Sequence, residues 1–166
     1  EKRIRLVGEI IHNPHVNQRI RDIGMDFILP GDDGAFDFSE LTEQDVVILP
    51  AFGVTVQDLA TLREVGCVLV DTTCGSVLLV WKRVESYARE GFTALIHGKH
   101  YHEESRATAS QVSNHEGGRY IIVRDMEEAD LICDYIANRP SRLSRGAFIE
   151  HFGVRATEGF DPDLDL

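Results

Sequence analysis

The chain has 166 residues, with 17 Lys and Arg against 28 Asp and Glu, which gives a formal net charge of −11. Apolar residues make up 43% and charged residues 27%, a composition that excludes disordered, collagen-like and disulfide-rich proteins. The acidic surplus argues against nucleic acid or an anionic membrane as a partner, because both need a basic face. No apolar run reaches the roughly 18 residues that cross a bilayer. Three Cys favour a reducing compartment, so we expect a cytoplasmic or organellar protein.

Short β-branched runs alternate with helical stretches along the chain. Strands are predicted over Ile4–Ile11, Val46–Leu49, Val68–Val70, Thr93–Ile96 and Tyr120–Val123. Helices are predicted over Val16–Ile23, Val56–Val65, Ser76–Glu90, Met126–Ala137 and, after a loop with Pro140, Ala147–Phe152. The first three helices stop at or just before Gly24, Gly66 and Gly91, which suits the left-handed cap that glycine adopts at low cost.

The repeated order of strand, helix and strand predicts an α/β fold of consecutive small parallel-sheet units. Because the strands are nearly all apolar, we expect each sheet to be covered on both faces. The first unit is placed over residues 1–74 and the second over residues 75–166. Ligands of such sheets gather beyond the carboxyl ends of the strands, so the polar side chains there are the candidates for function.

His12 follows the first predicted strand, and Pro14 opens the helix after it. The free N–H groups at a helix N-terminus favour anions, so an imidazole here can join them in binding an anionic ligand. The alternative is an imidazole that is satisfied by a backbone carbonyl. Position alone leaves these two interpretations equal.

Cys74 follows a buried strand and directly precedes a long helix. Positive partial charge at the helix start favours the thiolate, which is suited to metal ligation or nucleophilic attack. Cys67 and Cys133 are instead expected to be small core hydrophobes. The chain has no Cys-x-x-Cys, so it does not make a complete zinc or iron–sulfur site by itself.

The segment from Ile96 to Glu104 holds the densest group of polar side chains and leads from a strand into a helix. His100 and His102 share a face if the backbone is extended, and Glu104 stands where a helix start favours a carboxylate. Histidines can bind a metal, or phosphate when protonated, and Glu104 can act as a general acid. One hypothesis is therefore a mononuclear metal hydrolase that uses His100, His102 and Glu104.

Four ordered runs resemble the 4-hydroxy-3-methylbut-2-enyl diphosphate reductase family, particularly its plant and cyanobacterial branch. They are Glu9-Ile-Ile-His12-Asn-Pro, Val47-Ile-Leu-Pro-Ala-Phe-Gly53, Asp71-Thr-Thr-Cys74 and Ile96-His-Gly-Lys-His-Tyr-His102-Glu-Glu104-Ser-Arg-Ala-Thr108. The resemblance implies a two-electron reductive dehydroxylation of an allylic diphosphate, the last step of the non-mevalonate isoprenoid pathway. It also implies three pseudo-symmetric α/β units around a 4Fe-4S cluster held by three Cys, with a ferredoxin or flavodoxin as electron donor.

By position in this resemblance, Cys74 matches the middle cluster ligand, His12 and His102 match histidines that contact the substrate diphosphate, and Glu104 matches the acid that protonates the departing hydroxyl. Phe52 stands where many bacterial members have a His, so one diphosphate contact is missing or comes from elsewhere. The other two cluster Cys are expected outside this chain, which resembles the middle portion of the enzyme and is expected to be inactive alone. The competing hypothesis is a cofactor-free diphosphate-binding module without redox chemistry.

Overall fold

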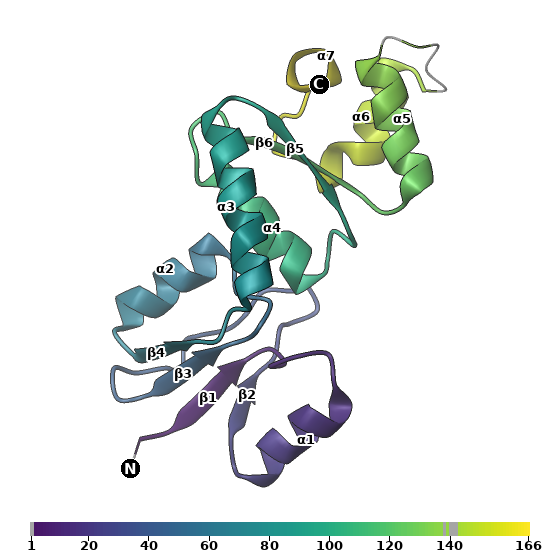
Figure 1. Ribbon diagram of the computed structural model, residues 1–166. Coiled ribbons are helices and arrows are strands. Elements are labelled where there is room, and N and C mark those ends of the chain that lie inside the picture. The colour runs from purple at the N-terminus through teal and green to yellow at the C-terminus, as the bar shows by residue number, and fades with distance from the viewer. Residues whose placement is uncertain (1, 138, 140–142) are drawn as a thin grey trace. The chain divides into compact units, whose positions relative to one another are not determined.

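The computed structural model describes residues 2–137, 139 and 143–166, so the predicted loop at Pro140 lies outside the described residues. The chain divides into two compact units, Glu1–Leu79 and Val80–Leu166, which are drawn in one colour gradient in Figure 1. The division falls inside α3 (Gly75–Arg89), the helix at whose first residue we placed the second unit. The predicted boundary between residues 74 and 75 remains a prediction.

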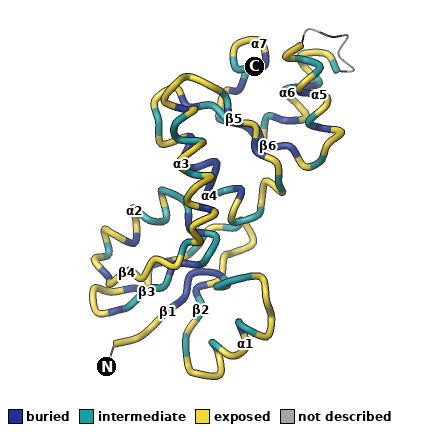
Figure 2. Tube along the Cα trace, viewed as in Figure 1, coloured by how far each residue is buried: buried dark blue, intermediate teal, exposed yellow. Residues whose placement is uncertain are grey.

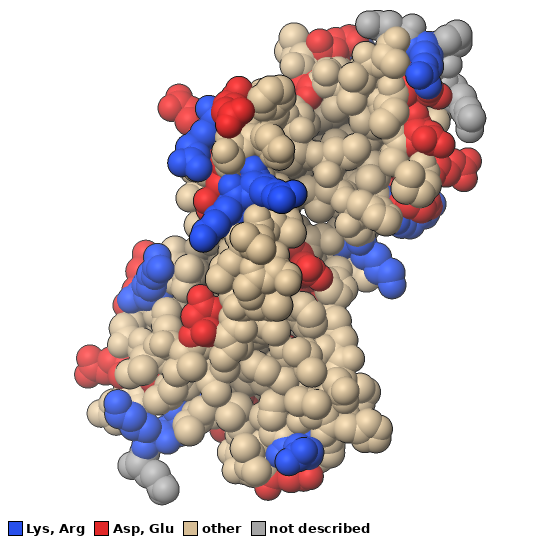
Figure 3. Space-filling view, in the orientation of Figure 1, with Lys and Arg blue, Asp and Glu red and all other residues tan. Residues whose placement is uncertain are grey.

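Within the described part of the chain, none of the helices has the length and apolarity needed to cross a membrane. On the face drawn in Figure 3, basic side chains lie interspersed with acidic ones over the described surface.

Unit 1 is a four-stranded parallel sheet with the strand order β2-β1-β3-β4. Its strands are β1 (Ile4–Val7), β2 (Asp26–Ile28), β3 (Val46–Leu49) and β4 (Val68–Asp71). Helix α1 (Pro14–Asp22) connects β1 to β2, and α2 (Val56–Val65) connects β3 to β4. All three strand pairs are parallel, which confirms the predicted crossover arrangement.

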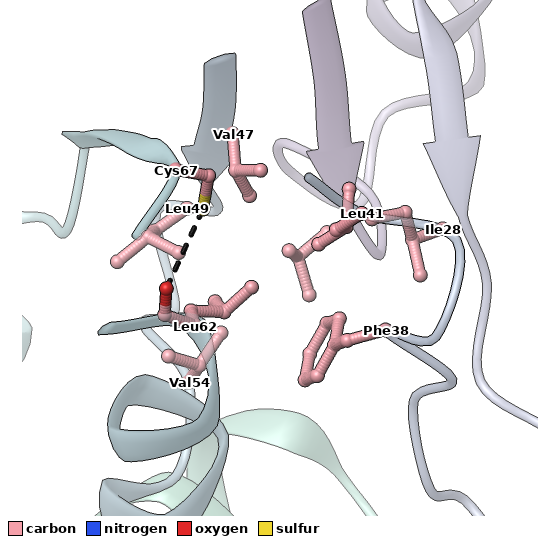
Figure 4. Packing of buried hydrophobic residues seen from close by; sticks show 9 residues of the cluster. Ile28, Phe38, Leu41, Val47, Leu49, Val54, Leu62 and Cys67 are labelled. Atoms are coloured by element: carbon pink, nitrogen blue, oxygen red, sulfur yellow. Dashed lines mark hydrogen bonds between the residues drawn. The ribbon is translucent and has the colours of Figure 1, made fainter. Parts of the chain in front are cut away.

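One face of this sheet packs on α2 and forms the core of unit 1. Val47, Leu49 and Leu62 lie at its centre, as the close view in Figure 4 shows. The Cys67 thiol donates to the carbonyl of Leu62 at 3.5 Å, the dashed line in that figure. Burial raises the pKa of the Cys67 thiol, which therefore stays protonated. The prediction that Cys67 is a core residue is confirmed.

The opposite face of the sheet is open over its β4 side. On β4, Val68 and Val70 are 44% and 42% exposed. Ile4, which begins β1 in the same row across the sheet as Val68, is 45% exposed. Figure 2 shows β4 as a largely exposed trace. The expectation that both faces of each sheet are covered is therefore wrong for this part of unit 1.

The first strand is shorter than predicted. It ends at Val7, because Gly8 has a φ of 62° and turns the chain out of the ladder while its N–H still donates to Ile28 at 2.8 Å. The short strand β2, which the sequence pattern did not indicate, pairs with β1. The glycines predicted to follow the first three helices have φ values of 84° (Gly24), 75° (Gly66) and 81° (Gly91), as a left-handed cap requires.

Unit 2 is built on a two-stranded parallel sheet of β5 (Thr93–His97) and β6 (Arg119–Val123). The helices are α3, α4 (Glu103–Ser113), α5 (Met126–Ile136), α6 (Arg145–Phe152) and α7 (Pro162–Asp165), with a 3₁₀ turn at Gly153–Arg155. Residues from α3 and α4 pack with Ala94, Ile96 and Ile122. Ile121 and Val123 pack on the other side with residues of α5 and α6, so helices cover both faces here.

A buried carboxylate joins three elements of unit 2. Glu128 on α5 accepts from the backbone N–H of Arg124 at 2.7 Å and from the Arg155 guanidinium at 2.8 Å, and His151 lies 3.2 Å away. Burial alone would raise the pKa of Glu128, but these hydrogen bonds outweigh it and hold the pKa below its usual range. Cys133, on the same helix, is exposed, so the prediction that it is a core residue is wrong.

Candidate active site

Cys74 occupies the start of α3, beyond the carboxyl end of β4. Its thiol is exposed, in contrast to that of Cys67. Its backbone carbonyl accepts from Leu78 at 3.0 Å, so Cys74 is the residue that begins the helical hydrogen-bond ladder. A thiolate at this point faces the positive end of the helix dipole, which is the environment that the sequence predicts.

His12 lies in an irregular segment between β1 and α1. The buried side chain of Asn17 holds this segment, because its Oδ1 accepts from Ile10 N–H at 3.3 Å and its Nδ2 donates to the Ile11 carbonyl at 2.9 Å. The side chain of His12 is 46% exposed, and its Nδ1 lies 3.5 Å from a carboxylate oxygen of Glu9. The imidazole is therefore accessible to a ligand from solvent.

The first turn of α1 does not offer the free N–H groups that we expected beside His12. The Asn13 side chain accepts from the N–H groups of His15 at 3.0 Å and Val16 at 3.2 Å. Pro14, the first residue of the helix, has no N–H. An anion at His12 would therefore have to displace the Asn13 side chain to reach these N–H groups. The prediction that free N–H groups of α1 help His12 to bind an anion is wrong.

The turn after β3 connects the two candidate residues of unit 1. The N–H of Ala51 donates to the Ile10 carbonyl at 3.0 Å, and its carbonyl accepts from Cys74 N–H at 2.9 Å. The aromatic ring of Phe52, the next residue, stacks on the His12 imidazole with 4.3 Å between ring centroids. The turn at Ala51 and Phe52 thus holds both the His12 segment and Cys74 at the same edge of the sheet.

A hollow of about 470 Å³ lies beyond the carboxyl end of β5 in unit 2. Its polar lining comes from the β5–α4 turn and the first turns of α4, and its apolar lining comes from α3 and β5. The residues are Val80, Val84, Leu95, Ile96, His97, Gly98, Lys99, His102, Glu104, Ser105 and Thr108. The turn approaches α4 closely at Gly98, where a Cβ would lie 2.5 Å from the Ser105 hydroxyl oxygen. Two predicted residues, His102 and Glu104, therefore share one hollow.

His102 has a structural role beside any functional one. It caps α4, since its Nδ1 accepts from the Glu104 N–H at 3.2 Å. An Nδ1 that accepts a hydrogen bond has no proton, so Nε2 carries the proton of the neutral ring. Glu104 is exposed on the same turn.

The predicted mononuclear metal site does not form. Among the described residues of unit 2, His100, His102 and Glu104 do not bring three ligand atoms within metal-binding reach of one another. The ring of His100 packs instead edge-on against Tyr101, with 5.3 Å between centroids. The ring of His97 lies 3.2 Å from the Arg124 carbonyl, which is an ordinary structural contact.

The model of the family described as "LytB protein" matches residues 1–147 of this chain. The chain belongs to the LytB family. A LytB relative from Gloeobacter violaceus, a 4-hydroxy-3-methylbut-2-enyl diphosphate reductase, is 48% identical over 168 residues and aligns with 99% of this chain and 38% of its own length. The chloroplastic reductase of Botryococcus braunii is 45% identical, with 100% of this chain and 32% of its own length aligned.

Solved structures extend this similarity to the fold. A structure of (E)-4-hydroxy-3-methyl-but-2-enyl diphosphate reductase, the terminal enzyme of the non-mevalonate pathway, has a TM-score of 0.63 and 28% identity, and the match covers 77% of this chain and 42% of that one. The Plasmodium falciparum reductase has a TM-score of 0.64 at 22% identity and supports the fold alone. The predicted α/β fold and the predicted family are confirmed. This LytB chain spans about two fifths of the length of its curated relatives, with 38% of the Gloeobacter violaceus reductase and 39% of a Synechococcus reductase aligned.

The roles of Cys74, His12, His102 and Glu104 stay predictions, although the structure shows how each is held. Sequence reasoning missed the contributions of Asn17 and Ala51. The Asn17 side chain bonds to backbone groups, which every residue has, so the sequence contains no partner residue that would indicate this contact. The contact of Phe52 with His12 joins residues on different loops and also leaves no local signal.

Proposed function

We propose that this chain is the central part of a reductase that converts 4-hydroxy-3-methylbut-2-enyl diphosphate into isopentenyl and dimethylallyl diphosphate. The reaction consumes the substrate, two electrons and two protons, and releases one water as the C–O bond of the allylic alcohol breaks. The observation that carries the proposal is the exposed Cys74 thiol, held through Ala51 at the same sheet edge as His12 in a chain of the LytB family. A metal-ligating thiolate and an anion-binding imidazole are what this reaction needs.

Cys74 fits one ligand position of an iron–sulfur cluster. It is the one Cys of the chain that is both exposed and at a helix start, whereas Cys67 is hydrogen-bonded in the core and Cys133 lies mid-helix in the other unit. Two further Cys ligands must come from outside these 166 residues. When bound, a 4Fe-4S cluster supplies electrons and an open iron position for the substrate hydroxyl.

The remaining roles belong to side chains of the two units. His12 and His102 are assigned to the substrate diphosphate, since an imidazole N–H donates to phosphate oxygens and a protonated imidazole also balances their charge. We assign this contact to the Nε2 of His102, because Nδ1 caps α4. Glu104, exposed in the hollow beside His102, is assigned to protonate the leaving hydroxyl, which is otherwise a poor leaving group.

The experiment that tests the proposal is a reductase assay on the full-length enzyme that contains this chain, with chemically reduced ferredoxin or flavodoxin as electron donor. Formation of isopentenyl and dimethylallyl diphosphate is expected from the wild type. The variant Glu104→Gln keeps the size of the side chain but holds no transferable proton, and it is expected to lose at least about 100-fold in turnover. The matched control is Glu116→Gln, a carboxylate in the loop before β6 and outside the hollow.

Product formation by Glu104→Gln at the wild-type rate would contradict the role of Glu104. A full-length wild type that binds the diphosphate but releases neither product, under any supply of electrons, would favour the cofactor-free binding module instead. The isolated 166-residue chain is expected to be inactive, because one thiolate does not hold the cluster.

A further inference from the structure

Phe52 lies in a turn whose geometry is tightly determined. The turn closes with a hydrogen bond from Gly53 N–H to the Pro50 carbonyl at 2.9 Å, and Gly53 has a φ of 73°, which favours glycine. The residue before Phe52 is anchored on two sides, to Ile10 and to Cys74. The backbone of Phe52 is therefore fixed relative to the segment that carries His12.

The ring of Phe52 covers one face of the His12 imidazole. The planes of the two rings are inclined by only 23°, and their centroids are 4.3 Å apart, which is the geometry of a stacked aromatic pair. In such a pair the imidazole nitrogens lie in the ring plane, so they point past the phenyl ring. The phenyl ring therefore does not cover the edge of the imidazole, where Glu9 approaches Nδ1 at 3.5 Å.

Burial does not fix the orientation of His12, because nearly half of its side chain is in contact with solvent. An exposed side chain occupies several rotamers, and holding it in one costs entropy when a ligand binds. A ring stacked on a fixed partner has lost much of that freedom before the ligand arrives. The side chain of Phe52 has no polar atom that could contact a phosphate. A polar effect of this side chain on an anionic ligand at this edge must therefore act through His12.

We propose that Phe52 is a positioning residue, whose ring holds the His12 imidazole edge-on to the diphosphate group of the substrate. The inference rests on the proposed function, because that function supplies the diphosphate. It also gives a physical role to the side chain at a position where many bacterial members of the family have a His.

The first test measures the stack itself and does not depend on the function. In the 166-residue chain, the ring current of Phe52 should shift the imidazole carbon-bound protons of His12 upfield in the NMR spectrum. Phe52→Leu is expected to remove this shift, whereas the signals of His15, on the exposed first turn of α1, stay in place. Unchanged His12 signals in a folded Phe52→Leu chain would overturn the inference.

The second test is a double-mutant cycle on product binding. The binding constant of isopentenyl diphosphate is measured by calorimetry for the full-length wild type, Phe52→Leu, His12→Ala and the double variant. Loss of one aromatic pair predicts about a two- to tenfold weaker affinity for Phe52→Leu. It predicts no further effect of that change once His12 is Ala. In the reductase assay the same variant should raise KM by a similar factor with kcat within about twofold, since the diphosphate lies away from the reacting bond.

Conservative variants separate positioning from folding. Phe52→Tyr and Phe52→Trp keep a stackable ring and are expected to retain the wild-type affinity. Equal weakening by Phe52→Leu with and without His12 would show a merely structural role and overturn the inference. A wild type that does not bind the diphosphate would instead contradict the proposed function, and the NMR result would then still report on the stack.

Discussion

Asn17 holds the segment that carries His12, so replacing it by Ala perturbs both stability and site. The side chain is fully buried, and its two hydrogen bonds satisfy Ile10 N–H at 3.3 Å and the Ile11 carbonyl at 2.9 Å. A backbone group left without a partner costs about 1 to 3 kcal/mol. The first bond is long, so we take about 1 kcal/mol for it and about 2 kcal/mol for the second. Ala is the better helix former by about 0.6 kcal/mol, which leaves a net loss of about 2 to 2.5 kcal/mol for unit 1.

Hydrogen exchange measured by mass spectrometry reports the loss of stability separately for unit 1 and unit 2. Amides of β1 and β3 that open with unit 1 are expected to exchange about 30- to 60-fold faster in Asn17→Ala at neutral pH, since 1.4 kcal/mol is a factor of ten. Amides of β6, in unit 2, should be unchanged. The control Gln18→Ala replaces an exposed neighbour on the same helix and should change exchange by less than about twofold to threefold. Equal protection of β1 in Asn17→Ala and Gln18→Ala would refute the assigned role of Asn17.

Two further predictions concern the ionisable side chains. Because the pKa of Glu128 is lowered in the folded state, its contribution to stability is present above the usual carboxyl range and is lost as the pH falls through the folded pKa. Melting temperatures between neutral pH and about pH 3 should therefore converge for wild type and Glu128→Gln on acidification; parallel curves would contradict the pairing with Arg155. Iodoacetamide followed by peptide mass spectrometry should label Cys74 and Cys133 in the native chain and Cys67 only after unfolding, and rapid native labelling of Cys67 would argue against the observed core.

Much of the fold follows from local signals in the sequence. The β-branched runs of β3, β5 and β6 and the glycines after the helices are local features, and each is found where the pattern predicts it. The strand β1 was predicted too long because Ile10 and Ile11 continue its apolar run, whereas the turn at Gly8 depends on the pairing with Ile28. The exposure of Cys133 likewise depends on which face of α5 meets its neighbours, and the apolar pattern of that helix is too broad to decide it.

The sequence predicts which residues belong to the candidate site, but it does not predict the contacts that hold them. Cys74 and the hollow at His102 lie at carboxyl ends of parallel strands, which the topology alone requires. The Asn13 cap that occupies the first turn of α1 is an ordinary N-cap signal, and it competes with the anion-binding role that the same turn suggested. The Phe52 stack on His12 and the hydrogen bonds of Ala51 with Ile10 and Cys74 join residues on different loops through tertiary packing, which sequence periodicity does not encode.

The most direct test of the proposed reductase is the iron and sulfide content of the full-length enzyme purified without oxygen. The comparison is between wild type, Cys74→Ser and Cys133→Ser, which removes the other exposed thiol. We predict a 4Fe-4S complement and its visible absorption in the wild type and in Cys133→Ser, and loss of both, together with reductase activity, in Cys74→Ser. Wild-type iron, sulfide and activity in Cys74→Ser would contradict the assignment of Cys74 as a cluster ligand and, with it, the central claim.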